Sequence, residues 1–151
     1  MCLTDKQKEL ITKNCTVSYV NNTKERQNKG QFFTPAELTI KMIEKFKSLD
    51  GCFIDPCGGN GNLLVGLISA GVSPECIYYN ELDSNEFEAG KKRLMEYGVP
   101  IENMTNFDAL SDEFAECYSG CAGFMNVIMN PPYIRNLHLK ILSKMMEIFQ
   151  Q

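Results

Sequence analysis

Short apolar runs and longer amphipathic segments alternate along this chain. The apolar runs, which are typical of buried strands, lie at 52–54, 76–80, 104–107 and 124–129. Segments with apolar residues at helical spacing lie at 3–14, about 34–47, 62–70, 84–97 and 137–148. Strands that alternate with helices form βαβ units around a mostly parallel sheet. The pattern therefore predicts an α/β fold with a doubly wound, Rossmann-like sheet.

Residues at the helix boundaries predict where two of these helices begin. Thr34 is expected to cap a helix that starts at Pro35, because a hydroxyl can accept a backbone N–H there and proline suits the first turn. Ser84 is the expected cap of the helix at 84–97, with Asp83 as a favourable charge at its positive end. The inward face of the first of these helices is predicted to consist of Leu38, Ile40, Met42, Ile43 and Phe46.

The length of 151 residues suits one domain with a sizeable core. Residues 1–28 are predicted to form a helical cap or extension, and a polar loop at 21–31 leads into the main domain at 29–151. The net charge of −4 argues against strong nucleic-acid binding by this segment alone. The basic cluster KERQNKG at 24–30 is typical of a solvated loop.

Cysteine usage and hydropathy indicate the compartment. The seven cysteines include no C-x-x-C pair, so we expect reduced thiols in a cytoplasmic chain, with neither a disulfide framework nor a metal site. No apolar run approaches the roughly 20 residues that cross a bilayer. The N-terminus, MCLTDKQKEL, lacks the apolar core of a signal peptide.

Polar residues follow each predicted strand. Asp55, Glu81 and Asp108 follow the first three strands, and Asn130 follows the fourth. The carboxyl ends of the strands in a doubly wound sheet line one edge, where open α/β sheets bind ligands. We therefore expect these four side chains to converge on one crevice.

A glycine-rich loop, DPCGGNGNL at 55–63, connects the first strand to the next helix. Gly58, Gly59 and Gly61 allow a tight turn and a close approach of a ligand to the backbone. The loop is similar to a dinucleotide fingerprint, but its spacing is not G-x-G-x-x-G and Asp55 would repel a pyrophosphate. An acid beside such a loop favours a ligand that carries an amino group.

The acids on the next two strands extend this interpretation. Glu81 is placed to accept hydrogen bonds from ribose hydroxyls, and Asp108 to accept one from the exocyclic amine of an adenine. Capping of a turn is an equally good explanation of Asp108. Together with the loop, the acids predict a cationic adenosine with an amino-acid tail, which is S-adenosylmethionine.

The fourth strand is followed by NPPY at 130–133. Proline cannot donate to a sheet ladder, so Pro131 and Pro132 end the strand and stiffen the segment after it. In isolation this tetrapeptide is explained almost as well by a rigid turn as by a catalytic segment. Its position at the ligand-binding edge favours the catalytic explanation.

These motifs together resemble the N6-adenine DNA methyltransferase family, over about residues 28–150. QFFTPAELTIKMI at 31–43 resembles the F-x-T-P segment of the family, and DPCGGNGNLL its glycine loop; NELD at 80–83, NFDAL at 106–110 and NPPY resemble its second-strand, adenine-contacting and catalytic motifs. The resemblance implies that the cofactor is held by Phe33, Thr34, Pro35, Asp55, Pro56, Gly58, Gly59, Gly61, Glu81, Leu82, Asp108, Ala109 and Asn130. It also implies that Asn130, Pro131, Pro132 and Tyr133 carry the catalytic step.

The implied chemistry suits these residue types. The Asn130 side-chain oxygen and the Pro131 carbonyl would each accept one N–H of an adenine amino group, whose lone pair then becomes available. Tyr133 offers a face on which an extruded base can stack. Phe33, or alternatively Phe32, would lie against the sulfonium. No metal is expected.

The family's catalytic domains continue with three more strands and a target-recognition region. We therefore expect a fragment, or a chain whose sheet is completed by a partner subunit or by self-association. The expected activity is methylation of adenine N6 in DNA, in a restriction-modification setting. The alternatives are methylation of RNA adenine or of a protein glutamine by the same chemistry, and an inactive domain that only binds cofactor or a partner.

Overall fold

The computed structural model describes residues 1–15, 24, 33–121, 123 and 125–150. Its core is a four-stranded parallel sheet with the strand order β3-β2-β1-β4. The strands are β1 (Cys52–Asp55), β2 (Ile77–Asn80), β3 (Met104–Thr105) and β4 (Met125–Val127). The chain moves outward from β1 through β2 to β3 and then returns to the other side of β1 for β4. This reversal places a topological switch point, where open sheets bind ligands, beside the carboxyl end of β1.

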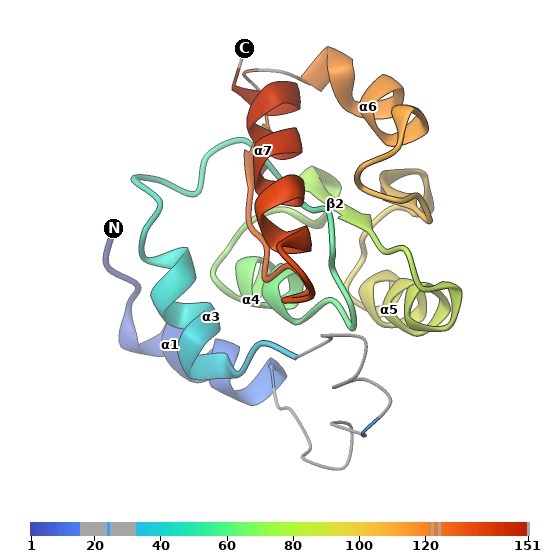
Figure 1. Ribbon diagram of the computed structural model, residues 1–151. Coiled ribbons are helices and arrows are strands. Elements are labelled where there is room, and N and C mark those ends of the chain that lie inside the picture. The colour runs from blue at the N-terminus through green and yellow to red at the C-terminus, as the bar shows by residue number, and fades with distance from the viewer. Residues whose placement is uncertain (16–23, 25–32, 122, 124, 151) are drawn as a thin grey trace.

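Helices cover both faces of the sheet. They are α1 (Asp5–Asn14), α3 (Ala36–Ile43), α4 (Asn62–Ser69), α5 (Ser84–Glu96), α6 (Asp112–Tyr118) and α7 (Leu137–Phe149), with short 3-10 helices at Pro74–Cys76, Ile101–Asn103 and Ser119–Cys121. Figure 1 shows α1 and α3 side by side near α4, with α6 and α7 in another part of the molecule.

The two faces of β1 belong to two separate hydrophobic clusters. Phe53 packs with apolar residues of α1, α3, α4 and α5, whereas Ile54, the next residue, packs with those of α6 and α7. Both side chains are fully buried. Since successive strand residues point to opposite faces, a strand that is apolar at both positions must be covered on both sides. The predicted α/β fold with a doubly wound parallel sheet is confirmed.

Two predicted helix starts are wrong. The cap of α3 is Pro35, and no side chain makes a capping hydrogen bond there, because the Thr34 hydroxyl accepts a hydrogen bond from Asn130 instead. The cap of α5 is Asp83, one residue before Ser84, and its carboxylate accepts two backbone N–H groups of the first turn. The charge expected of Asp83 thus acts as the cap itself.

The inward face of α3 also differs from the prediction. Leu38 is 42% exposed, and Thr39 is buried in its place. The Thr39 hydroxyl donates to the Pro35 carbonyl at 3.1 Å, so its polar atom is satisfied within the helix and the residue can be buried. Of the other predicted positions, Ile43 belongs to the buried core cluster, and Ile40, Met42 and Phe46 are partly buried and pack against it.

Three of the four strands are shorter than predicted, β1 extends one residue further, to Asp55, and one helix is missing from the prediction. Cys76 belongs to a 3-10 helix, β3 ends at Thr105 and β4 spans only Met125–Val127. Helix α6 was not predicted, although Ser111 accepts the Phe114 N–H as its cap. It is only seven residues long, and its two buried residues are Phe114 and Tyr118, so its helical pattern in the sequence is weak.

Two expectations lie largely or wholly outside the described residues. They are the polar loop at 21–31 and the domain boundary at 28–29. Within the described ranges, no helix combines the length and apolar character that a membrane crossing requires.

Candidate functional site

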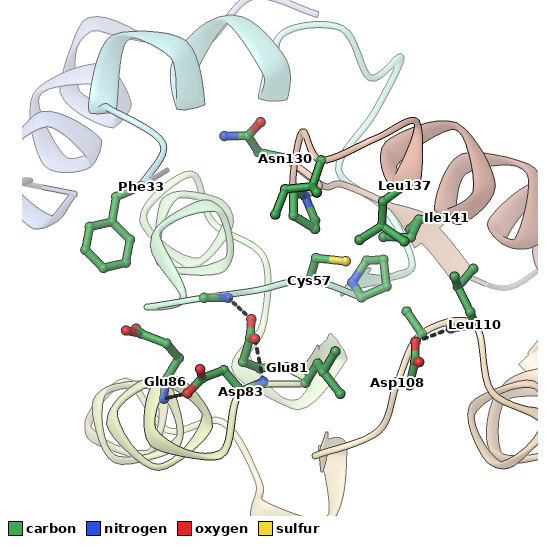
Figure 2. A pocket seen from close by; sticks show the side chains of 16 residues that line it. Phe33, Cys57, Glu81, Asp83, Glu86, Asp108, Leu110, Asn130, Leu137 and Ile141 are labelled. Atoms are coloured by element: carbon green, nitrogen blue, oxygen red, sulfur yellow. Dashed lines mark hydrogen bonds between the residues drawn. The ribbon is translucent and has the colours of Figure 1, made fainter. Parts of the chain in front are cut away.

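A cavity of about 400 Å³ opens at the carboxyl edge of the sheet (Figure 2). Its volume lies in the range of small-molecule and cofactor sites. Phe33 and Glu86 lie at one end of it, and Leu110 and Ile141 at the other. The lining residues are Phe33, Pro56, Cys57, Gly59, Glu81, Leu82, Asp83, Glu86, Asp108, Ala109, Leu110, Asn130, Pro132, Ile134, Leu137 and Ile141.

The glycine loop forms the floor of this cavity through close backbone contacts. The Gly58 N–H donates to the Asn80 carbonyl at 2.9 Å, and the Gly61 N–H donates to Gly58 at 2.8 Å. A Cβ atom on Gly58 would lie 2.5 Å from the Tyr79 ring, whose hydroxyl donates to the Gly59 carbonyl at 2.6 Å. Gly59 and Gly61 have φ angles of 52° and 80°, which side-chain-bearing residues rarely adopt. The loop therefore needs glycine at all three positions.

Glu81 connects the end of β2 to the glycine loop. One carboxylate oxygen accepts the Gly59 N–H at 2.8 Å, and the other accepts the Asp83 N–H at 2.9 Å (Figure 2). Burial raises the pKa of Glu81, while the two N–H donors act in the opposite direction. Each carboxylate oxygen can accept more than one hydrogen bond, so this side chain can also receive hydroxyl groups of a ligand.

Asp55, the last residue of β1, is 2% exposed. Its Oδ1 accepts the Cys57 N–H at 3.0 Å. Burial raises the pKa of Asp55 to about 8, and the nearby Glu81 carboxylate adds to that rise. A second, smaller cavity of about 30 Å³ lies against it, lined by Phe33, Thr34, Asp55, Cys57, Gly58, Gly59, Asn60, Asn62, Leu63 and Asn130. Polar walls and this volume suit a small charged group.

Asp108 lies beyond β3 at the other end of the larger cavity. Its Oδ1 accepts the Leu110 N–H at 2.9 Å, and its carbonyl accepts hydrogen bonds from Ser111, so the residue shapes the turn before α6. It is exposed and also lines the cavity. Both explanations of Asp108 from the sequence, turn capping and ligand contact, are compatible with this position. Its neighbour Ala109 is buried against the same cavity.

Asn130 lines both cavities and joins two distant segments. Its Nδ2 donates to Thr34 Oγ1 at 3.2 Å, so NPPY contacts the segment before α3. Pro132 lines the larger cavity, whereas Tyr133 does not line it and is 58% exposed. The Tyr133 ring lies 5.3 Å from the ring of His138 on α7. An exposed aromatic face is therefore presented outside the cavity.

Most of the predicted site residues come together here. Those that line one or both cavities are Phe33, Thr34, Asp55, Pro56, Gly58, Gly59, Glu81, Leu82, Asp108, Ala109, Asn130 and Pro132. Pro35, Gly61, Pro131 and Tyr133 line neither of them. Gly61 shapes the loop through its positive φ, Pro35 is the N-cap of α3, and Pro131 lies in the segment after β4. Phe32, the alternative to Phe33, lies outside the described residues.

Several residues that build the site were not predicted from the sequence. Leu137 and Ile141 of α7 form an apolar wall, and Cys57 lies between the two cavities. Asn80 is fully buried; its Nδ2 donates to the carbonyls of Pro56 and Phe107, and so it ties the glycine loop to the segment after β3. A buried asparagine at the end of an apolar strand, directly before a candidate acid, is the sequence signal for this role.

The charge of the site favours a cationic ligand. Four of the lining residues are Glu81, Asp83, Glu86 and Asp108, and no described Lys or Arg side chain lines either cavity. Asp55 adds a further carboxyl group. Among the described residues no group of three or more His, Cys, Asp or Glu side chains could hold a metal ion. An anionic pyrophosphate would meet these carboxylates at short range.

Comparisons with known proteins agree with this geometry. The family model for N-6 DNA methylase matches residues 17–146. The type II methyltransferase M.VspI from Vibrio sp. (strain 343) is 29% identical over 118 residues, which make up 76% of this chain and 28% of that protein. The methyltransferase subunit of a type I restriction-modification system from Streptococcus thermophilus matches with a TM-score of 0.54 and 27% identity, over 71% of this chain and 25% of that one. This chain thus spans about a quarter of the length of each relative.

Proposed function

Because this chain belongs to the N-6 DNA methylase family, we propose that it binds S-adenosylmethionine and transfers its methyl group to the exocyclic N6 of adenine in DNA. The observation that carries the proposal is the convergence of Asp55, Glu81, Asp108 and Asn130 on two adjoining cavities at the switch point of the sheet. The setting that we propose is restriction and modification, as in the type I system to which the structural relative belongs.

The residues present fit this cofactor. Glu81 is placed for the ribose hydroxyls, and Asp108, Ala109 and Leu82 border the part of the cavity that suits a flat adenine. Asp55 and Thr34 border the smaller polar cavity, which suits the amino group of the amino-acid tail. The Phe33 ring offers a π-face to a cation. When bound, S-adenosylmethionine supplies an electrophilic methyl group on a positively charged sulfur.

The NPPY segment would bind the acceptor. An adenine amino group is a weak nucleophile, because its lone pair is delocalised into the ring. Oδ1 of Asn130 and the carbonyl of Pro131 would each accept one of its N–H groups, which favours a pyramidal nitrogen with an available lone pair. The exposed ring of Tyr133 is available to stack on a base that has left the duplex. These residues supply position and electrostatic stabilisation.

We propose that further polypeptide of the same methyltransferase covers the edge of β4. Within the described residues β4 pairs only with β1. A largely apolar groove of about 540 Å³ runs along β4, between the end of α3 and α7. The relatives are about four times as long as the matched part, so their additional chain, in the same polypeptide or as a separate subunit, is the occupant that we propose.

The proposal is tested by measuring cofactor binding first and then transfer of a tritiated methyl group to DNA, to RNA and to protein. We expect saturable cofactor binding and label in DNA. Label in RNA or in a protein glutamine would mean that the same chemistry acts on another acceptor. Binding without any transfer would support a non-catalytic subunit, and a protein that binds no cofactor would contradict the proposal as a whole.

A further inference from the structure

A chain of hydrogen bonds runs from α5 to the proposed catalytic asparagine. Arg93 Nη1 donates to Asn62 Oδ1 at 2.7 Å, and Asn62 Nδ2 donates to the Thr34 carbonyl at 2.9 Å. Thr34 Oγ1 in turn accepts from Asn130 Nδ2 at 3.2 Å. Four residues from four separate segments are thereby connected, and Asn62 and Thr34 are 2% and 5% exposed.

The first bond of this chain has a fixed direction. A guanidinium group can only donate hydrogen bonds, so Asn62 must turn its oxygen toward Arg93. Its NH₂ group then faces the Thr34 carbonyl. Arg93 is itself held, because it also donates to the carbonyls of Asn60 at 3.0 Å and Asn14 at 2.8 Å. The orientation of the Asn62 amide is therefore set by the end of α1, the glycine loop and α5 together.

The Thr34 hydroxyl can accept or donate, and in this structure it accepts from Asn130 Nδ2, so the position of Thr34 helps to set the orientation of the Asn130 amide. With its NH₂ group on the Thr34 hydroxyl, the Asn130 amide directs its oxygen to another side. If the amide were reversed, an N–H donor would meet the N–H donors of the acceptor amine, and the hydrogen bonds that activate that amine would be lost. A shift of Thr34 would release this restraint.

We propose that Asn62 and Arg93 are positioning residues for methyl transfer, which act through Thr34 on the orientation of the Asn130 amide. The inference rests on the proposed function, because it assigns these residues to the same reaction. It adds two side chains: Asn62, which borders the smaller cavity, and Arg93, which lines neither cavity. It also makes the end of α1 part of the support of the site.

The test is Asn62→Asp. The carboxylate keeps an acceptor for Arg93 but cannot donate to the Thr34 carbonyl, and the two oxygens repel each other. The matched control is Asn103→Asp. Asn103 is 8% exposed and donates to the carbonyls of Glu75 and Ile77, both at 3.0 Å, at the amino end of β2, away from the site. Both variants lose buried hydrogen bonds from an amide to the backbone.

Two readouts separate positioning from general destabilisation. The first is the pair of side-chain amide signals of Asn130 in ¹⁵N-edited NMR spectra of the cofactor-free protein. The second is the single-turnover rate of methyl transfer to DNA at saturating cofactor. In Asn62→Asp we expect the Asn130 signals to shift and the rate to fall about 10- to 100-fold, the scale of a misplaced reacting group. In Asn103→Asp both should stay close to wild type, and cofactor Kd should change by no more than about twofold, as for a site independent of the cavities.

The inference is overturned if the Asn130 signals in Asn62→Asp remain at their wild-type positions, or if the two variants lose rate equally. If wild type methylates no acceptor, the proposed function fails, while the NMR readout still decides the positioning role. Should Asn62→Asp not fold, Thr34→Val and Thr34→Ser replace it. Valine removes the hydroxyl acceptor and should reproduce the shift and the loss of rate, and serine should restore both; failure of serine to rescue either one overturns the inference.

Discussion

Asn130 Nδ2 and Thr34 Oγ1 lie 3.2 Å apart, although 96 positions separate the two residues in the sequence. This bond joins the segment that borders the smaller cavity to the segment that follows β4. A ligand that orders one segment therefore affects the other. In the proposed enzyme, the cofactor side and the acceptor side meet at this pair.

Asn130→Ala should abolish methyl transfer and leave cofactor binding nearly intact. The alanine removes the acceptor for the adenine amine, and loss of such a preorganised group costs about 10²- to 10³-fold in rate. The check is tritiated methyl transfer together with calorimetric cofactor titration. Asn126→Ala is the control, because Asn126 lies on β4 and donates to the carbonyls of Asp50 and Cys52, away from the cavity. Loss of both transfer and binding in Asn130→Ala would place the catalytic segment elsewhere.

Glu81→Gln should weaken cofactor binding and also lower stability. Both carboxylate oxygens accept backbone N–H groups, and the NH₂ of glutamine would oppose one of those donors. A buried donor left unsatisfied costs about 1–3 kcal/mol. Chemical denaturation measures the free energy of unfolding, and calorimetry measures cofactor Kd. The exposed Glu102→Gln is the control, and equal behaviour of the two variants would remove Glu81 from the site.

Stability should depend on pH through Asp55. Its pKa in the folded protein is raised to about 8, whereas an unfolded Asp titrates near about 3.9. Between these values the folded protein holds a proton that the unfolded chain has lost, so the free energy of unfolding falls as pH rises through this window and levels off above it. Asp55→Asn should flatten this slope in denaturation curves recorded across the range. A slope that persists in the variant would belong to another group, with Glu81 the first candidate, since its pKa is also raised.

Cofactor affinity should show the opposite pH dependence. The ionised Asp55 carboxylate attracts a cationic amino group, and the protonated form does not. The association constant should therefore rise with pH toward about 8, as long as the amino group of the cofactor stays protonated. Calorimetric titrations at several pH values measure this, and Asp55→Asn should bind more weakly with a flatter profile. A wild-type affinity that does not change with pH would contradict the placement of the amino group beside Asp55.

Gly58→Ala should destabilise the fold and disturb the cavity floor. The added Cβ would lie 2.5 Å from the buried Tyr79 ring, so one of them must move. Overpacking of this kind costs about 1–3 kcal/mol, and cofactor Kd should rise as the loop shifts. Gly120→Ala, where nothing lies within 4 Å of the new Cβ, should remain close to wild type in urea denaturation. A Gly58→Ala protein as stable as this control would mean that the loop does not need its close contact with Tyr79.

The elements that the sequence predicts well are those with strong local signals. Apolar runs followed by an acid identify β1 and β2, and a cluster of glycines identifies the loop between β1 and α4, where Gly59 and Gly61 have positive φ. The rules of parallel sheets then bring Asp55, Glu81 and Asp108 together, as the cavities show.

The elements that the sequence does not predict depend on contacts between distant segments. Thr34 looks like a helix cap locally, but the presence of Asn130 draws its hydroxyl into another bond. Arg93 looks like an ordinary charge on α5, and only the folded chain brings it to Asn62. Tyr133 belongs to NPPY, yet whether its ring enters the cavity depends on the path of the chain into α7, which keeps it outside, beside His138.

The central claim is the identity of the methylated atom. DNA that has been incubated with the protein and methyl-labelled S-adenosylmethionine can be digested to nucleosides and analysed by mass spectrometry. We predict labelled N6-methyl-2′-deoxyadenosine from DNA treated with wild type, and its loss from DNA treated with Asn130→Ala. Label on another base or position, or an equal yield from Asn130→Ala, would contradict the role assigned to the cavity and to Asn130.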